Sequence, residues 1–264
     1  MSTDPVLYEE TNGVAIVTLN RPERLNSWTG PLGSAYFDAL DRARDSGSVK
    51  AIVVTGAGRG FCSGADMDML QGIGERGGEG DVQPKLRNER HDYALTIPKP
   101  VIAAINGACA GLGFVHAMMA DIRFAAEGAK FTSAFARRGL IAEHGVSWML
   151  PRVVGPSNAL DILMSGRVFL ADEAKDLGVV SRVYAPDELV AATVEYAAEL
   201  GRYSAPWSMA QMKRQVWSQL DQDRTAALDE TNEIMRESLR RPDFKEGVAS
   251  FVERRDPNFG AIGD

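Results

Sequence analysis

Residues 99–113 read Lys-Pro-Val-Ile-Ala-Ala-Ile-Asn-Gly-Ala-Cys-Ala-Gly-Leu-Gly, and this stretch decides the fold. Residues 101–105 are apolar and partly β-branched, which predicts a strand buried on both faces. Asn106-Gly107 is a turn signal, and two further glycines precede the apolar residues 114–120, which predict a helix. Because the first N–H groups of a helix have no intrahelical acceptor, such a turn can bind an anion or a developing oxyanion.

A second glycine-rich turn follows an earlier strand. Residues 51–55 predict a buried strand, and residues 56–65 separate it from a helix that begins near Met67. Two such turns side by side could each supply one backbone N–H to the same oxygen, which is the design of an oxyanion hole. The pattern alone favours ordinary turns that need glycine for backbone reasons. A dinucleotide-binding loop is disfavoured, because the helix does not open directly after the glycines.

Length and composition exclude several classes of protein. The chain has 264 residues, of which 45% are hydrophobic and 25% charged, as in ordinary globular proteins. The net charge of −7 argues against a nucleic-acid partner. Two isolated cysteines indicate reduced thiols, no secretion signal precedes the first strand, and the apolar runs are too short to span a bilayer. We therefore expect a cytoplasmic protein without a membrane or nucleic-acid partner.

The rest of the chain alternates between strands and helices up to about residue 185 and is helical from about residue 187. The further strands are apolar or β-branched runs between turn signals, and they cover residues 7–10, 14–19, 121–125, 130–132 and 179–183. A helix is expected over residues 31–44, and the glycine-rich residues 71–89 are expected to form a mobile surface loop. This alternation predicts an α/β core with parallel strands and crossover helices.

Several segments in this order resemble the motifs of the crotonase superfamily, which is also called the enoyl-CoA hydratase/isomerase family. They are residues 19–26 (LNRPERLN), 61–67 (FCSGADM), 99–107 (KPVIAAING), 111–113 (GLG), 118–123 (MMADIR), 244–247 (FKEG) and 251–255 (FVERR). The resemblance covers nearly the whole chain. It implies an acyl-CoA-binding core of repeated ββα units in residues 1–185 and a helical trimerisation region in residues 186–264.

The resemblance also implies the ligand and the assembly. The ligand is an acyl-CoA thioester, so coenzyme A is part of the substrate, and no separate cofactor or metal is expected. The assembly is a homotrimer or a dimer of trimers. The thioester oxygen would lie between the N–H groups of Ala65 and Leu112, where it becomes an enolate oxygen during the reaction. The family usually has glycine at the position of Leu112, but a backbone N–H survives that change.

Further substrate contacts are implied along the chain. By position they are Arg24, Leu25, Cys62, Gly64, Asp66, Gly111, Lys245 and Phe259. Residues 62–64 would meet the adenine through backbone atoms. Lys245 and Phe259, from this chain or from a neighbouring copy, would lie near the phosphate-bearing nucleotide end, where a cation is favourable. Residues 71–89 occupy the region that shapes the acyl pocket in this family.

The catalytic carboxylates of the hydratases are missing. Those enzymes carry two glutamates, and the matching positions here are Val115 and Phe135, which cannot transfer protons. Glu143 remains, in a loop that resembles the one bearing the single catalytic carboxylate of Δ3,Δ2-enoyl-CoA isomerases and related ring-modifying isomerases. One carboxylate suffices for a 1,3-proton shift. The resemblance therefore favours double-bond isomerisation of an enoyl-CoA, with Glu143 as the single acid/base.

Alternatives stay open at this point. His144 could orient Glu143, contact the substrate, or act as a second acid/base that restores water addition to a 2-enoyl-CoA. The other hypotheses are an acyl-CoA-binding protein of low activity and a hydrolase of CoA thioesters or carbon–carbon bonds. We expect His116 to be a partly buried helix residue and His91 to be exposed. Cys62 and Cys109 are expected to be packing residues, because no histidine–cysteine motif accompanies them.

Overall fold

The computed structural model describes residues 3–75 and 90–262 and contains two sheets. The strands of the larger sheet, in spatial order, are β1 (Val6–Thr11), β2 (Val14–Leu19), β3 (Ala51–Gly56), β5 (Val101–Ile105), β7 (Ile122–Ala126) and β10 (Arg182–Tyr184). The smaller sheet contains β4 (Gly60–Cys62), β6 (Ala108–Ala110), β8 (Lys130–Thr132) and β9 (Phe169–Leu170). Strand pairs β1–β2 and β8–β9 are antiparallel, and the other neighbours are parallel.

The chain repeatedly passes from the larger sheet to the smaller one and then into a helix. The units are β3–β4–α2, β5–β6–α4 and β7–β8 followed by α5, with α2 at Met67–Glu75, α4 at Leu112–Met118 and α5 at Val146–Val154. Each repeat advances both sheets by one parallel strand, so the ends of successive large-sheet strands meet at one edge. The predicted α/β core of repeated ββα units is confirmed.

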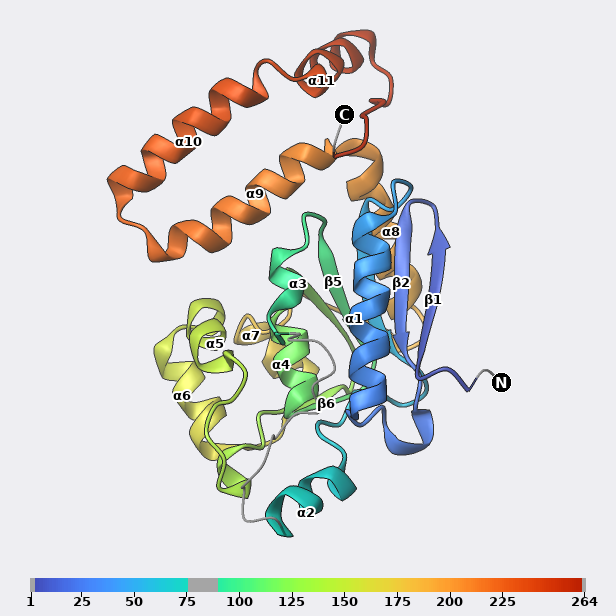
Figure 1. The fold of residues 1–264 in the computed structure, drawn as a ribbon, viewed down its shortest axis with the longest axis vertical. Coiled ribbons are helices and arrows are strands. Elements are labelled where there is room, and N and C mark those ends of the chain that lie inside the picture. The colour runs from blue at the N-terminus through green and yellow to red at the C-terminus, as the bar shows by residue number, and fades with distance from the viewer. Residues whose placement is uncertain (1–2, 76–89, 263–264) are drawn as a thin grey trace.

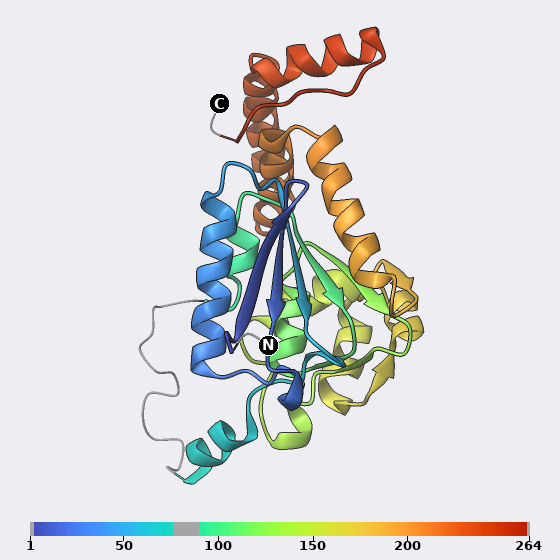
Figure 2. The ribbon, with the colours of Figure 1, turned by 90° about the vertical axis from the view of Figure 1, so that its right-hand side faces the viewer.

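Helices cover both faces of the larger sheet. Helix α1 (Gly30–Asp45) lies on one face and α8 (Leu189–Tyr203) on the other, as Figures 1 and 2 show. Along β3, Ile52 and Val54 belong to the core under α1, whereas Ala51 and Val53 pack with α8. This explains the unbroken apolar pattern of the central strands, because neither face of them meets water.

Some local predictions are confirmed and others are wrong. The predicted hairpin at Asn12-Gly13 and the helix over residues 31–44 are confirmed, the latter as α1. The stretch 99–113 was expected to pass from a strand through a turn to a helix, but the additional strand β6 intervenes. Strands β4, β6 and β9 have two or three residues, and they exist because of long-range pairing, which a local pattern does not encode. Residues 71–75 are the end of α2 and not a loop; residues 76–89 lie outside the described part of the chain.

The remaining helices lie in three parts of the chain: α3 (Tyr93–Thr96) precedes β5, α6 (Pro156–Ser165) and α7 (Ala171–Asp176) lie between α5 and β10, and α9 (Pro206–Ser218), α10 (Arg224–Ser238) and α11 (Pro242–Glu253) follow α8. Helices α10 and α11 extend away from the two sheets in both views (Figures 1 and 2). Within residues 3–75 and 90–262, no helix has the length and apolar character that crossing a membrane requires.

A buried ion pair fastens α9 to the core. Lys213 Nζ lies 2.7 Å from Asp121 Oδ2, and Trp217 Nε1 donates to the other carboxylate oxygen at 3.1 Å. The ammonium group also donates to the backbone carbonyls of Ala94 and Lys99, at 2.7 and 3.1 Å. The side chains of Lys213 and Asp121 are only 8% and 14% exposed, so each charge depends on the other for compensation.

Replacing Lys213 with methionine is expected to lower the free energy of unfolding by about 3 kcal/mol, because it leaves a buried carboxylate and two carbonyls with fewer partners. Urea denaturation measures the change as a shift of the midpoint at an unchanged m value. Lys175→Met is the matched control, because Lys175 is exposed, and it is expected to change stability by less than about 0.5 kcal/mol. Equal midpoints for the two variants would contradict the anchoring role of Lys213.

Candidate active site

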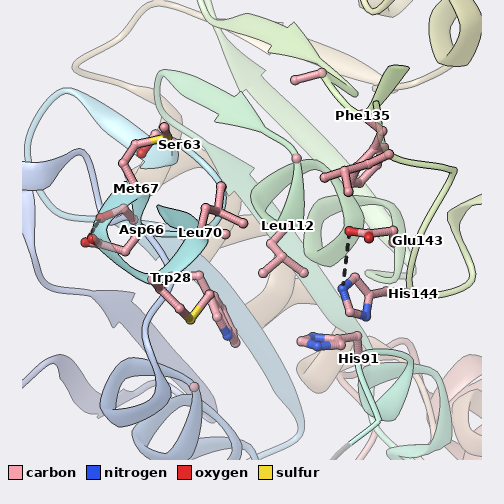
Figure 3. A pocket seen from close by; sticks show the side chains of 18 of the residues that line it. Trp28, Ser63, Asp66, Met67, Leu70, His91, Leu112, Phe135, Glu143 and His144 are labelled. Carbon is pink, nitrogen blue, oxygen red and sulfur yellow. Dashed lines mark hydrogen bonds and ion pairs between the residues drawn. The ribbon is translucent and has the colours of Figure 1, made fainter. Parts of the chain in front are cut away.

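A cavity of about 640 Å³ opens where the turn after β4, the start of α4 and the loop before α5 meet. A volume of this size is typical of sites for small molecules and cofactors. The lining residues that matter for the predictions are Arg24, Trp28, Gly64, Ala65, Asp66, His91, Gly111, Leu112, Phe135, Glu143 and His144. Figure 3 shows Glu143, His144 and His91 on one side of Leu112, and Asp66 with Met67 on the other.

The two glycine-rich turns touch each other at the cavity. A side chain on Gly64 would come within 3.0 Å of the Ala110 carbonyl oxygen, and one on Gly111 would meet Gly64 Cα at 3.6 Å. Both glycines also have positive φ values, +100° and +50°, that disfavour other residues. Each of them is followed directly by a predicted donor, Ala65 or Leu112. Within the described residues, the N–H groups of these two donors have no hydrogen-bond acceptor.

Asn106 fixes the spacing between the two turns. Its Nδ2 donates to the carbonyls of Gly56 and Gly58, at 2.8 and 3.0 Å, and its Oδ1 accepts from Gly56 N–H at 3.2 Å. Parallel pairing of β4 with β6 continues this link. The close approach also requires Gly113, since a Cβ atom there would lie 2.1 Å from the Cys62 carbonyl oxygen. The local sequence at Asn106-Gly107 signals only a turn, and this bridging role of Asn106 has no local signal.

Asp66 anchors the first turn to the loop that follows β2. Its Oδ2 accepts from Ser27 Oγ at 2.8 Å and lies 3.1 Å from Arg21 Nη1. The hydrogen bond from Ser27, followed by that from Arg21, holds the pKa of Asp66 below its usual value, although burial opposes the shift. The carboxylate is therefore ionised and already satisfied by protein groups. It lines the cavity, and its contact with substrate remains a prediction.

Glu143 and His144 lie on a strained turn directly before α5. His144 has a φ of +54° and Gly145 one of +80°, and the Glu143 carbonyl accepts from Val146 N–H at 3.1 Å. Non-glycine residues with positive φ are uncommon and often occur at functional sites. His144 Nε2 lies 3.9 Å from Glu143 Oε2, too far for a direct hydrogen bond but close enough for electrostatic coupling. Burial lowers the pKa of His144, which Glu143 partly opposes, so His144 is neutral near pH 7.

The two positions at which hydratases carry glutamates are apolar in space as well as in sequence. Val115 is fully buried in α4, and Phe135 lines the cavity. Among the described residues that line the cavity, the carboxylates are those of Asp66 and Glu143. Because Asp66 is held by Ser27 and Arg21, Glu143 is the carboxylate available for proton transfer. Its side chain is 34% exposed.

The prediction that His91 is exposed is wrong. His91 is half-buried and lines the cavity, and its Nδ1 lies 3.1 Å from His116 Nε2. His116 is buried on α4, deeper than expected, and stacks on Trp28 with ring centroids 4.0 Å apart. The turn at residues 91–92, directly before α3, places His91 against His116 of α4, a long-range contact that no local pattern in the sequence signals.

Of the other predicted contact residues, Arg24 lines the cavity, and Leu25, Lys245 and Phe259 do not. Arg24 is exposed, and the side chain of Leu25 packs against Gly60. Lys245 on α11 and Phe259 do not line the cavity of their own chain, and Figure 1 shows α11 at the end of the molecule opposite α2. A contact between either residue and the substrate would therefore come from another copy, as the resemblance allowed.

The two cysteines are packing residues. Both are free and buried, and Cys62 pairs with Cys109 between β4 and β6. Burial raises the pKa of the Cys62 thiol to about 12 and that of Cys109 well above its usual value. Both thiols are therefore protonated at neutral pH, which argues against a nucleophilic role.

Comparison with known proteins points to one family. A family model described as enoyl-CoA hydratase/isomerase matches residues 9–261. The chain is 32% identical over 256 residues to the 1,2-epoxyphenylacetyl-CoA isomerase of Escherichia coli K12. This alignment covers 96% of this chain and 97% of that protein. It is 35% identical over 263 residues to a probable enoyl-CoA hydratase of Rhodobacter capsulatus, which covers 98% of this chain and 99% of that protein.

Solved structures agree with this assignment. An enoyl-CoA hydratase from Mycobacterium marinum is 47% identical with a TM-score of 0.70, over 82% of this chain and 98% of its own. An enoyl-CoA hydratase from Polaromonas sp. JS666 reaches a TM-score of 0.89 at 29% identity, over 96% of this chain and 99% of its own. The sequence motifs, the repeated ββα units and these matches lead to one conclusion: the chain belongs to the enoyl-CoA hydratase/isomerase family, and it is an enzyme of the crotonase superfamily.

Proposed function

We propose that this enzyme moves the double bond of an enoyl-CoA, with Glu143 as the single acid/base. The Glu143 carboxylate takes a proton from C2 of a 3-enoyl thioester, and the electron pair of that C–H bond moves toward the thioester oxygen. The resulting dienolate takes the proton back from Glu143 at C4, which gives a 2-enoyl thioester of the same composition. No water enters, and no second acid/base is needed.

Within residues 3–75 and 90–262, one available carboxylate and two N–H groups without an acceptor lie around the same cavity, and this pairing carries the proposal. The N–H groups of Ala65 and Leu112 would hold the thioester oxygen and stabilise the negative charge that it gains. They follow the touching glycines Gly64 and Gly111, so the contact between the two turns determines their separation. An enolate benefits from these donors more than the neutral substrate does, and this difference lowers the barrier.

Hydration is the second candidate. His144 lies 3.9 Å from Glu143, so the two could share the work of activating water and returning a proton to C2. The name of the relative in Rhodobacter capsulatus, a probable enoyl-CoA hydratase, favours this reaction, whereas the relative in Escherichia coli is named an isomerase. The apolar residues Val115 and Phe135, at the positions of the hydratase glutamates, argue for isomerisation.

Product analysis separates these reactions. The enzyme is incubated with trans-2-hexenoyl-CoA and, separately, with trans-3-hexenoyl-CoA, and the products are identified by mass and by the absorbance of the conjugated thioester. Isomerisation predicts conversion of the 3-enoyl substrate at constant mass. A gain of one water from the 2-enoyl substrate would instead support hydration, and release of free coenzyme A would support hydrolysis. Binding of both thioesters without turnover would support the low-activity binding protein.

The assembly and the nucleotide contacts remain proposals. We infer that a homotrimer, or a dimer of trimers, covers the C-terminal helices. Their exposed apolar side chains support this inference, and they are Leu228, Met235, Leu239, Phe244, Val248, Phe251 and Val252. Such a partner could also bring Lys245 and Phe259 to the nucleotide end of a neighbouring substrate. Arg24, exposed at the cavity, is the proposed cationic contact within the chain. A cytoplasmic location and the absence of a cofactor other than the substrate's coenzyme A remain predictions from the sequence.

A further inference from the structure

The three histidines of the chain gather at one side of the cavity, although 25 and 28 residues separate consecutive ones along the sequence. His91 and His144 line the cavity, and the buried His116 lies behind His91. His91 precedes α3, His116 belongs to α4, and His144 precedes α5. The rings of His91 and His144 are in edge contact, with centroids 4.1 Å apart (Figure 3). The mechanism above uses Glu143 and leaves His91 and His116 without a role.

His116 holds His91 at the cavity wall. His91 Nδ1 and His116 Nε2 are 3.1 Å apart and share one hydrogen. His116 is itself fixed, because it stacks on Trp28 at 4.0 Å and meets the edge of Tyr36 at 5.1 Å. The second nitrogen of His91, Nε2, has no hydrogen-bond partner within the part of the chain that the structure describes. His91 therefore presents an oriented polar atom, without a partner among the described residues, on the wall that also carries Glu143 and His144. The surface of the cavity as a whole is mostly apolar.

The environment of the His91 imidazole distinguishes between three possible roles, which are metal binding, acid–base catalysis and hydrogen bonding. In the described residues, no three side chains of His, Cys, Asp or Glu are arranged to hold a metal ion. Burial, followed by repulsion from His144, lowers the pKa of His91 to about 4, although Asp92 opposes the shift. Burial also lowers the pKa of His116 well below its usual value. His91 is therefore neutral at pH 7. Too little of it is protonated to act as an efficient general acid, and its pKa is too low for a strong base. With metal binding and acid–base catalysis disfavoured, hydrogen bonding is the remaining role for this side chain.

We propose that His91 Nε2 hydrogen-bonds an oxygen atom on the acyl group, so that the enzyme prefers oxygen-bearing acyl chains to plain hydrocarbon chains, with His116 as the positioning residue. This inference rests on the proposed function only in that the cavity holds the acyl part of a CoA thioester. It does not depend on the reaction that Glu143 performs.

The tautomer of the histidine pair determines whether His91 Nε2 is a hydrogen-bond donor or an acceptor. When His116 Nε2–H donates to His91 Nδ1, the second proton of the pair lies on His91 Nε2, which can then donate to a carbonyl, hydroxyl or ether oxygen. In the opposite arrangement His91 Nε2 accepts from a hydroxyl group. A chain that covers Nε2 with methylene groups alone removes water from it and supplies no partner, which costs binding free energy.

Binding measurements test this preference without requiring turnover. The dissociation constants of hexanoyl-CoA, 4-oxohexanoyl-CoA, 5-oxohexanoyl-CoA and 6-hydroxyhexanoyl-CoA are measured by calorimetry on the full-length Glu143→Gln variant, which prevents proton abstraction. We expect at least one oxygenated thioester to bind about tenfold more tightly than hexanoyl-CoA, which corresponds to one neutral hydrogen bond. The additional change His91→Phe should abolish this ratio, and the affinity for hexanoyl-CoA should not fall, because phenylalanine has no polar atom to desolvate.

Three further variants separate the roles of the histidines. His116→Phe should reduce the ratio and His116→Gln should restore part of it, because glutamine can still bond to His91 Nδ1. His144→Asn, which leaves the pair intact, should keep the ratio. Equal affinities for all four thioesters, or a ratio that survives in His91→Phe, would overturn the inference while leaving the proposed function standing. A protein that binds none of the thioesters would contradict both.

Discussion

Glu143→Gln is expected to lower kcat for conversion of a 3-enoyl-CoA by about 10³-fold, within the range typical of general acid–base catalysis. Glutamine has nearly the same shape as glutamate but cannot accept the C2 proton. The described residues offer no substitute, because the other carboxylate on the cavity wall, Asp66, is held by Ser27 and Arg21. Steady-state kinetics on wild type and variant measure the effect.

The affinity for an unreactive acyl-CoA controls for damage to the site. The dissociation constant of hexanoyl-CoA should change by less than about threefold, because the substitution alters the acid/base and neither the cavity wall nor the two N–H donors. His144→Asn is the matched comparison, and isomerisation by Glu143 alone predicts a loss of less than about tenfold there. A kcat within tenfold of wild type for Glu143→Gln would show that another group moves the proton.

Leu112→Pro is expected to lower kcat by 10² to 10³-fold, which is the usual cost of losing one oxyanion donor. Leu112 is the first residue of α4. Proline is well tolerated at the first position of a helix, because the N–H it lacks has no intrahelical acceptor. The substitution therefore deletes the proposed donor and largely preserves the helix. It tests a backbone group that ordinary side-chain mutagenesis cannot remove.

Leu112→Ala separates the donor from the side chain. It keeps the N–H and shortens a side chain that lines the cavity, so kcat should stay within about tenfold of wild type, and larger acyl groups should gain relative to smaller ones. Thermal unfolding of both variants tests for damage to α4. Equal losses of kcat in the alanine and proline variants would argue that the leucine side chain, and not its N–H, supports the reaction.

Much of this architecture could be predicted from local sequence. The apolar run 101–105 and the turn signal at Asn106-Gly107 gave the central strand and its end, because burial on both faces leaves a continuous apolar pattern. The glycines at positions 64 and 111 marked the two turns, since close contact and positive φ both require glycine there. The motifs of the family then extended these local signals to the whole chain.

The features that were missed depend on contacts between distant segments. The three-residue strands β4 and β6 are stabilised by each other and by Asn106, which bonds to carbonyls about 50 residues earlier in the chain. The inward position of His91 depends on His116, 25 residues later. Neither interaction leaves a periodic trace, so a sequence pattern could name the residues but not bring them together.

One measurement tests the single-carboxylate mechanism most directly. The wild-type enzyme and Glu143→Gln are incubated with trans-3-hexenoyl-CoA in D₂O, and the first product is followed by mass spectrometry and NMR. The proposed mechanism predicts trans-2-hexenoyl-CoA from the wild type, with no mass change other than deuterium incorporation, and essentially none from the variant. A water adduct as the first product, or the same product formed at an undiminished rate by Glu143→Gln, would contradict it.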